Sequence, residues 1–248
     1  MPDDSRIKVA LVTGAARRVG RAIALELAAR GFALAIHYHN TPPPEVEATL
    51  AASRACGPAA EGFRADLADP QAIEALFAAV HARFGRLDVL VNSASAFQRL
   101  RLMEVTLADW QQTMAVNLTA PFLCTQAAVR QMRAQSPPGV VIINLGDHGS
   151  LEPWPEYAHH GISKAGLLAL TQVTALSEAP LIRANMVIPG LVLKPESMTD
   201  ARWSVVTAAT PAGRPGTPED VARAVAFLAE EPFITGAVLR VDGGAGLA

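Results

Sequence analysis

The feature that most constrains this chain is an apolar run followed at once by a glycine turn and a helical pattern. Val9–Val12 is uninterrupted and apolar, Gly14 and Gly20 lie in the turn, and residues 21–30 place apolar side chains at helical spacing before Gly31. A strand, a glycine turn and a helix in this order aim the free N–H groups of a helix N-terminus at one point, which suits a phosphate. The turn therefore predicts a nucleotide site, and the alternative is a tight turn without a ligand.

Strand and helix patterns alternate to the end of the chain. The strand patterns are Val9–Val12, Ala33–Tyr38, Glu61–Ala65, Val89–Asn92, Val140–Leu145, Ile182–Ile188 and Val238–Val241. The helix patterns lie near residues 18–30, 45–56, 69–84, 107–134, 157–178 and 217–231. This alternation predicts an α/β fold with a doubly wound parallel sheet of seven strands and helices on both faces. Since no linker rich in Pro, Gly or Ser divides the chain, we expect residues 1–248 to form a single domain.

Two segments are too long and irregular to be simple connections. Residues 193–216 join a strand to a helix over many more positions than usual, and they contain an apolar helical patch at 201–209. Residues 146–155 form the second segment. Both follow the carboxyl ends of predicted strands, where ligands bind in such sheets. We therefore expect a substrate lid at about 193–216.

Composition and charge exclude several kinds of partner. The formal net charge is −2 without a run of Lys or Arg, so neither nucleic acid nor an anionic membrane is expected as a partner. Cys56 and Cys124 are too few for a disulfide framework. The sequence also has no charged leader with an apolar stretch and no apolar segment of spanning length. We expect a cytoplasmic protein that acts on a small molecule and has no metal site.

Five separated motifs occur in an order and spacing that a known family shares. They are Thr13-Gly14-x-x-x-Arg18-x-Gly20, Asp66-Leu67, Asn92-Ser93-Ala94-Ser95, Pro189-Gly190, and Ile234-Thr-Gly with Val241-Asp-Gly-Gly244. Across nearly its whole length the chain resembles the short-chain dehydrogenases/reductases. The resemblance implies a Rossmann fold and a nicotinamide dinucleotide. Most members of that family carry glycine where Arg18 stands.

Four local features resemble one branch of this family, the pteridine reductases and the related alternative dihydrofolate reductases. The four features are Ala16-Arg17-Arg18-Val19-Gly20, His37-Tyr38-His39, Ser95-Ala96-Phe97, and Asn144-Leu-Gly-Asp147 with Asp where most relatives have Ser. The resemblance implies a reductase that acts on a pterin or a folate.

The resemblance also implies the residues that hold the cofactor. They are Gly14, Arg18, Val19, Gly20, His37, Tyr38, His39, Asn40, Thr41, Asp66, Leu67, Asn92, Ser93, Ala94, Lys164, Pro189, Gly190 and Leu191. An acidic residue at the end of the second strand would accept hydrogen bonds from the ribose and repel a 2′-phosphate, but no acid occurs there before Glu45. Arg18 and neutral donors in its place favour a phosphate dianion, so we expect NADP(H). In the alternative interpretation, His37 and His39 are ordinary loop residues.

The family's chemistry is hydride transfer coupled to protonation of the acceptor. The resemblance implies a Tyr four residues before a Lys on one helix, a Ser or Asp on the preceding strand, and an Asn in the long helix before it. Lys164, Asn117 and Asp147 stand at matching positions. The residue four before Lys164, however, is His160, so the Tyr is missing from its place. We expect Asp147, His160, Lys164 and Asn117 to be the catalytic residues.

Three interpretations of the missing Tyr stay open. In the first, His160 is the acid, because imidazole is the side chain that titrates near neutral pH. In the second, Asp147 is the acid, directly or through water, held protonated by desolvation while His160 orients it or the substrate. In the third, the site binds its ligands without turnover.

Phe97 is the candidate for substrate recognition. In the enzymes that the chain resembles, the matching aromatic ring stacks on the pterin, which adds about 0.5–1.5 kcal/mol beyond burial. The alternative is an ordinary core Phe. Arg18, Ser95, Asp147 and Tyr157 are the other expected substrate-binding residues.

We therefore predict an NADPH-dependent reductase that transfers hydride to a C=N bond of a dihydropterin or dihydrofolate. One alternative is a carbonyl or 3-oxoacyl reductase with the same fold and cofactor. Another is a non-catalytic NADP(H)-binding protein. Members of the family usually assemble as tetramers through two long helices, here near 107–134 and 157–178, so a homotetramer is expected.

Overall fold

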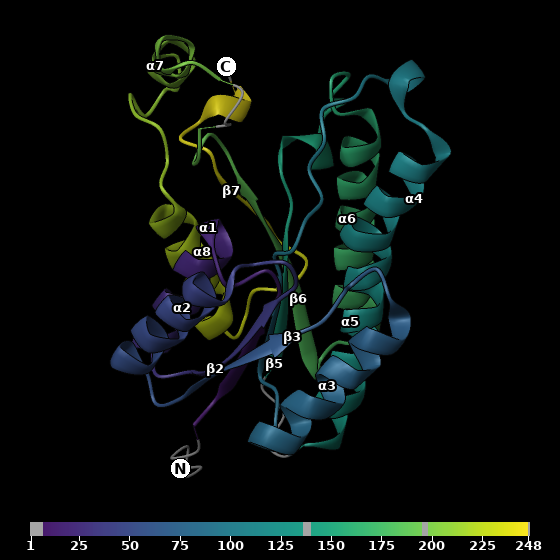
Figure 1. Ribbon diagram of the computed structural model, residues 1–248, viewed down its shortest axis with the longest axis vertical. Helices are drawn as coiled ribbons and strands as arrows, with labels where there is room; N and C mark the ends of the chain where they lie inside the picture. Colours follow the sequence, from purple (N-terminus) through teal and green to yellow (C-terminus); the bar gives the residue numbers. More distant parts are fainter. Residues whose placement is uncertain (1–6, 136–139, 195–197, 248) are drawn as a thin grey trace.

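The computed structural model describes residues 7–135, 140–194 and 198–247. Its centre is a parallel sheet of seven strands in the order β3-β2-β1-β4-β5-β6-β7, with helices on both sides (Figure 1). The strands are β1 Val9–Val12, β2 Ala33–Tyr38, β3 Ala60–Arg64, β4 Val89–Asn92, β5 Val140–Leu145, β6 Ile182–Pro189 and β7 Val238–Val241. The α/β doubly wound fold predicted from the sequence is confirmed.

The helices pack in two layers, one on each face of the sheet, as the side chains of β1 show. Ala10 and Val12 belong to one apolar core and Leu11 to the other, as the alternating directions of strand side chains require. Helices α1, α2 and α8 cover one face, and α3, α4, α5 and α6 cover the other (Figure 1). The helix bounds are α1 Arg18–Ala29, α2 Pro43–Cys56, α3 Pro70–Phe84, α4 Leu107–Met114, α5 Ala120–Ala134, α6 Ala158–Ser177, α7 Asp200–Ala208 and α8 Pro218–Glu230.

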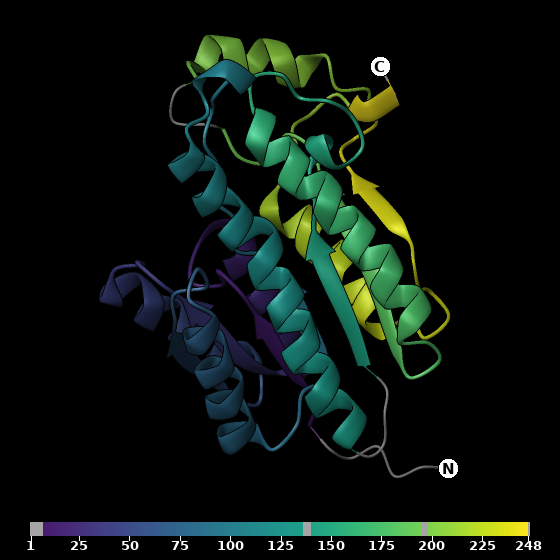
Figure 2. The same ribbon diagram turned by 90° about the vertical axis from the view of Figure 1, so that its right-hand side faces the viewer.

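The helix expected over 107–134 is not continuous. A π-helical turn, Ala115–Thr119, separates α4 from α5. Pro121 explains the interruption, because proline has no N–H to donate and its ring crowds the carbonyl group four residues earlier, that of Asn117. Figure 2 shows α5 and α6 side by side on this face, with α7 lying across the top.

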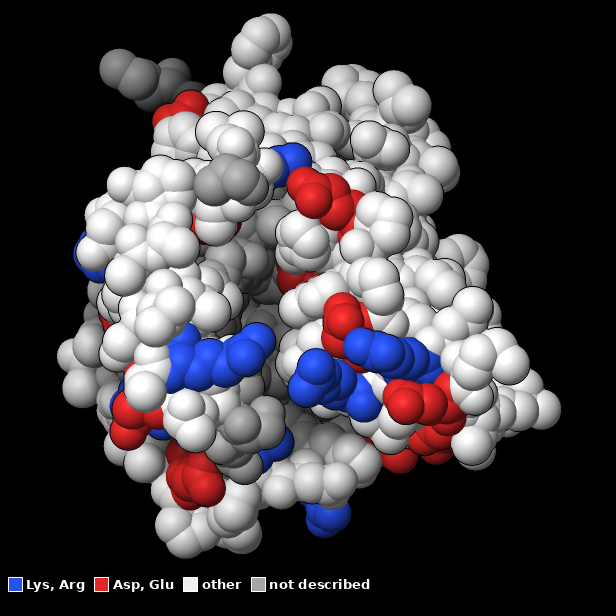
Figure 3. Space-filling model, turned by 90° about the horizontal axis from the view of Figure 1, so that it is seen from above, with Lys and Arg blue, Asp and Glu red and all other residues white. Residues whose placement is uncertain are grey.

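The carboxyl ends of the strands form the edge at which the candidate site lies. Because β1 pairs with β2 on one side and β4 on the other, the chain reverses its direction of winding there, and ligands bind at such a switch point. Seen from this edge the surface is hollowed near its middle, and Lys and Arg side chains lie beside the hollow (Figure 3).

Helix α7 occupies part of the predicted lid at 193–216, of which residues 195–197 lie outside the described residues. The function of this segment as a lid stays a prediction. Within the described part of the chain, none of the helices combines the length and the apolar character needed to cross a membrane.

Candidate active site

The glycine turn after β1 is tied to the neighbouring strands. Gly14 has a φ of +64°, a conformation that glycine adopts without strain. The hydroxyl oxygen of Thr13 accepts hydrogen bonds from the backbone N–H groups of Ser93, at 2.9 Å, and Ala94, at 3.0 Å. The turn after β1 is thereby held against the turn after β4, and the backbone groups expected to meet the cofactor share one crevice.

The first turn of α1 has the geometry of a phosphate site. A Cβ atom at Gly20 would lie 2.3 Å from the carbonyl oxygen of Gly14, so only glycine lets the helix start this close to the turn. No described side chain caps the helix, which leaves the first N–H groups of α1 available to an anion. Arg18 has a φ of +55°, a strained conformation for a residue other than glycine, and its side chain is exposed.

His37 is buried beneath the turn after β1 and holds it by a hydrogen bond. The N–H of Gly14 donates to its Nδ1 over 3.1 Å, and its Nε2 lies 3.1 Å from the carbonyl oxygen of Ala65. Since the amide can only donate and the carbonyl can only accept, the ring is neutral with its proton on Nε2. Burial lowers the pKa of His37 to about 4. The expected contact between the His37 ring and a 2′-phosphate therefore does not fit the structure, in which both ring nitrogens already have backbone partners. His37 holds the turn after β1 instead.

The end of β2 leaves several donors at the rim of the crevice. His39 and Thr41 are partly exposed and Asn40 is exposed, while the Tyr38 ring packs against the core. His39 Nε2 lies 3.9 Å from Asp66 Oδ2. Their positions agree with an adenosine-ribose site at this end of the sheet.

Arg64 lies at the same rim and was not among the residues predicted from the sequence. Its exposed side chain donates from Nε to the carbonyl oxygen of His39 over 3.3 Å. The parallel pairing of β2 with β3 sets Arg64 opposite Tyr38. A basic residue at the end of the neighbouring strand was the signal in the sequence.

Other expected cofactor residues contribute through the backbone or face inward. The side chain of Asn92 donates to Asn144 Oδ1 over 2.8 Å inside the sheet, so it ties β4 to β5. Leu67 is buried, and Asp66 Oδ1 accepts from the N–H of Ala68 over 2.9 Å. Pro189 ends β6, Gly190 and Leu191 follow it, and all three are partly exposed at the carboxyl edge.

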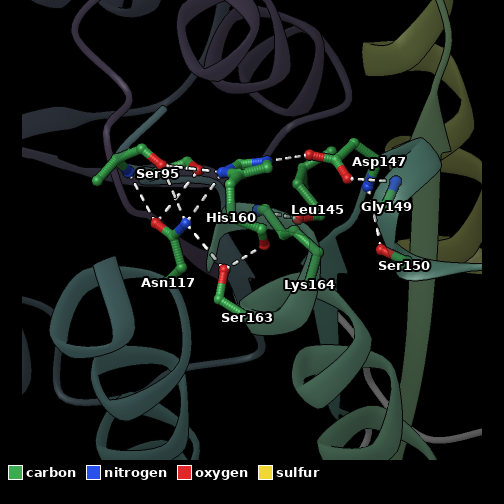
Figure 4. A network of polar contacts seen from close by, with 10 residues as sticks. Ser95, Asn117, Leu145, Asp147, Gly149, Ser150, His160, Ser163 and Lys164 are labelled. Carbon is green, nitrogen blue, oxygen red and sulfur yellow. Dashed lines mark hydrogen bonds and ion pairs between the residues drawn. The ribbon is translucent and has the colours of Figure 1, made fainter. Parts of the chain in front are cut away.

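The expected catalytic side chains do come together (Figure 4). Lys164 is buried on α6, and its Nζ donates to the carbonyl oxygen of Leu145 over 2.7 Å. Burial lowers the pKa of Lys164, and the carboxylate of Asp147 opposes that change.

Asp147 and His160 form a direct pair between the end of β5 and the first turn of α6. The contact joins Asp147 Oδ2 and His160 Nε2. Burial by itself would raise the pKa of Asp147, but the hydrogen bond with His160 and the charge of Lys164 outweigh it and hold that pKa below the usual value. Asp147 is thus a carboxylate that also accepts, at Oδ1, from the N–H of Gly149 over 2.9 Å.

Two glycines set the separation of this pair. A Cβ atom at Gly149 would lie 2.8 Å from the Cα atom of Gly161. The backbone that follows Asp147 and the backbone that follows His160 are therefore in direct contact, and this contact brings the carboxylate to the imidazole.

Asn117 lies in the π-helical turn and holds the other side of His160. Its Oδ1 accepts from the N–H of Ala96 over 2.7 Å, and its Nδ2 donates to the carbonyl oxygen of Ala96 over 2.9 Å and to Ser163 Oγ over 3.1 Å. The π-helical turn directs this amide into the site, a frequent use of such turns.

Aromatic rings cover the imidazole. The ring of Phe97 stacks on Tyr157 with centroids 4.6 Å apart and meets His160 edge-on at 4.8 Å. Phe97 is 54% exposed, so its ring is not part of the core. Trp154 lies 4.2 Å from Tyr157, centroid to centroid, and extends this wall. The sequence could not show which face of these rings is open.

Comparison with known proteins agrees with this geometry. The family model described as "Enoyl-(Acyl carrier protein) reductase" matches residues 14–246. The chain belongs to the short-chain dehydrogenase/reductase family of oxidoreductases.

Curated relatives match almost the entire chain. 3beta-Hydroxysteroid dehydrogenase 1 of Eggerthella lenta is 35% identical over 98% of this chain and 95% of its own length. A 3-oxoacyl-[acyl-carrier-protein] reductase of Synechocystis is 34% identical over 96% of both chains. L-Rhamnose 1-dehydrogenase (NAD(P)(+)) of Sphingomonas is 33% identical over 96% of this chain and 95% of its own length.

Proposed function

We propose that this protein is an NADP(H)-dependent reductase that delivers a hydride to a polarised double bond and a proton from the Asp147–His160 pair. The observation that carries the proposal is the contact between this pair, beside the amine of Lys164, at the carboxyl edge of the sheet. A site that had lost its chemistry would not need a carboxylate, an imidazole and a buried amine in one cluster.

The residues at this edge fit a phosphorylated nicotinamide dinucleotide. The uncapped start of α1 suits the diphosphate, while Arg18, His39 and Arg64 offer charge or donors near the end of β2. When bound, the cofactor supplies the hydride. We propose that Lys164 holds the ribose next to the nicotinamide and that Asn117 keeps the imidazole in place. Titration with both reduced dinucleotides tests this, and tighter binding of NADH than of NADPH would contradict it.

A carbonyl is the acceptor that the curated relatives favour. The names of the three relatives describe a hydroxysteroid dehydrogenase, a 3-oxoacyl reductase and a sugar dehydrogenase. Each name describes chemistry at a hydroxyl-bearing or carbonyl carbon. We therefore propose reduction of a ketone, with 3-oxoacyl thioesters as the first compounds to assay.

A dihydropterin or dihydrofolate is the second candidate, and one observation favours it. The ring of Phe97 presents an open face beside Asp147 and His160. A flat heterocycle can stack on such a ring, and its N–H groups can donate to a carboxylate. Arg18 and Ser95, both exposed at the same crevice, would complete that subsite.

One assay separates the two candidates. NADPH oxidation is followed with acetoacetyl thioesters, a panel of simple ketones, dihydrobiopterin and dihydrofolate at equal concentrations. Turnover of ketones alone supports the carbonyl reductase, and turnover of the pterins alone supports the second candidate. Tight NADPH binding without oxidation by any of these compounds would contradict a reductase and favour the non-catalytic alternative.

We also propose a homotetramer assembled through α5 and α6. Four large apolar side chains on these helices are exposed, namely Phe122 at 43%, Ile162 at 46%, Val173 at 61% and Leu176 at 83%. A groove of about 990 Å³, lined mainly by residues 101–104 and 149–156, extends this apolar surface at the start of α6. Light scattering measures the mass of the assembly, and a Val173→Asp variant should dissociate it.

A further inference from the structure

We propose that Asp147 and His160 share a single proton and act together as one acid, which Asp147 presents to the acceptor. The inference deepens the proposed reductase function and rests on it. Neither side chain is then the proton donor by itself, and the pair takes the place of the family's missing Tyr.

The backbone N–H of Ala96 has only one possible role in a hydrogen bond. The N–H of Ala96 can only donate, and it points at Asn117 Oδ1 over 2.7 Å. This fixes the orientation of the Asn117 amide, so Nδ2 carries the two hydrogens. These hydrogens have nearby acceptors in the carbonyl oxygen of Ala96, at 2.9 Å, and Ser163 Oγ, at 3.1 Å.

The orientation of Asn117 then determines the state of the imidazole. His160 Nδ1 lies 3.0 Å from the carbonyl oxygen of Ala96, which can only accept, and 3.2 Å from Asn117 Nδ2, whose two hydrogens have closer acceptors in Ala96 and Ser163. Nδ1 therefore carries a hydrogen and donates it to Ala96. His160 Nε2 faces Asp147 Oδ2, and both atoms carry lone pairs unless one proton lies between them.

Losing that proton is unfavourable within the protein. A neutral ring with its hydrogen on Nδ1 would turn the Nε2 lone pair directly toward the Asp147 carboxylate in a partly desolvated site. Two acceptors in contact repel, and burial strengthens the repulsion. The pair is thus arranged to regain a proton after each turnover.

The exposure of the two side chains shows which of them meets the acceptor. The His160 side chain is 1% exposed, whereas that of Asp147 is 22% exposed. An imidazole is also shorter than a phenol, so a ring at position 160 cannot reach as far as a Tyr hydroxyl would. The more exposed Asp147 carboxylate, in contact with the ring, makes up that difference.

The step balances as follows. The reduced cofactor, when bound, would supply one proton and two electrons together as hydride for the new C–H bond. The electron pair of the C=O or C=N bond moves to its heteroatom, which takes the shared proton from Asp147 Oδ2. The pair is left as a carboxylate and a neutral imidazole that keeps Nδ1–H on Ala96, and solvent returns one proton. The charged or titratable groups that interact with the pair are Lys164 and His159.

Protonation of the ring is tested without turnover. In protein labelled with 15N-histidine and saturated with NADP, we expect the His160 signals at pH 7.5 to show hydrogen on both nitrogens or a hydrogen shared at Nε2. In Asp147→Asn, Nδ1 keeps its hydrogen and Nε2 becomes an acceptor. The exposed His148 in the same spectrum is the internal control. An Nδ1 without hydrogen in the unaltered protein would overturn the proposal.

Kinetics supply the second test. Removing the acid through His160→Phe or Asp147→Asn should lower the single-turnover rate of hydride transfer by about 10²–10⁴-fold each. The double variant should be no slower than the slower single variant, because both changes remove the same proton. Losses that multiply would show two independent acids and refute the pair.

A matched control variant and a measurement without turnover keep the outcomes separable. His148 and Glu152 form a second imidazole–carboxylate contact, at 3.8 Å on the surface, and His148→Phe with Glu152→Gln serves as the matched double variant. If no acceptor is reduced by the unaltered protein, the proposed function fails, while the 15N spectra still decide whether the proton is shared.

Discussion

His37 makes the stability of the fold depend on pH in a way that can be calculated. We choose His37→Gln as the perturbation, because glutamine offers one acceptor and one donor but does not titrate. The folded protein keeps the ring neutral between Gly14 and Ala65, with its pKa lowered from 6.5 to about 4. In the unfolded chain the same ring titrates at its ordinary value.

The sign and size follow from proton linkage. Between pH 6.5 and about 4 the unfolded chain binds a proton at His37 that the folded protein does not bind, so acid favours unfolding. The stabilisation is present above pH 6.5 and is lost as the pH falls toward 4. From pH 7 to pH 5 the two pKa values correspond to a loss of about 2 kcal/mol in the free energy of unfolding.

Urea unfolding at pH 7, 6 and 5 measures this effect in the unaltered protein and in His37→Gln. Other groups titrate in both proteins, so the difference between the two isolates His37. We expect the advantage of the unaltered protein to shrink by about 2 kcal/mol between pH 7 and pH 5. A difference that stays constant with pH would refute the assignment of a neutral, buried ring. In His37→Leu, two buried backbone groups lose their partner, which should cost about 1–3 kcal/mol each at pH 7.

Three further variants test residues beside the crevice. Gly20→Ala should abolish NADPH binding, measured by cofactor fluorescence, because its Cβ would lie 2.3 Å from the Gly14 carbonyl oxygen; retained affinity would contradict the tight turn. Arg18→Gly should raise the free energy of unfolding by about 1 kcal/mol, since it relieves a positive φ. The same variant should weaken NADPH more than NADH in calorimetric titration, and equal losses would show that Arg18 does not read the 2′-phosphate. Phe97→Ala should raise KM for the acceptor while the Kd for NADPH changes little, and an equal effect on both constants would remove its stacking role.

The fold could be predicted because its elements carry simple local signals. β1, β2, β4, β5 and β7 begin and end at the predicted residues, since these segments are mostly apolar, as parallel strands inside a sheet require. The break between α4 and α5 was missed although Pro121 was its signal, because helical spacing of apolar residues continues on both sides of it.

The site was harder to predict, because its chemistry depends on distances between elements far apart in sequence. Lys164, Asn117 and Asp147 were found because they stand at positions that match the motifs of the family that the chain resembles. That His37 is buried depends on the packing of β3 against β2, and that His160 touches Asp147 depends on the approach of α6 to the end of β5. The sequence named these residues but could not choose between His160 and Asp147 as the proton donor, or between either of them and a site without turnover.

The contact between Gly149 and Gly161 depends on the missing side chain of Gly149, whereas a Cβ atom at Gly161 would lie 3.8 Å from its nearest neighbours, an ordinary contact. The two backbones meet with no side chain between them, since a single methyl group at Gly149 would lie 2.8 Å from the Cα atom of Gly161. A methyl group there would separate the loop from the helix, and a carboxylate moved away from its imidazole would no longer hold a common hydrogen. The acidity of this crevice therefore depends on a residue without a functional group, Gly149, as well as on the two residues that have one.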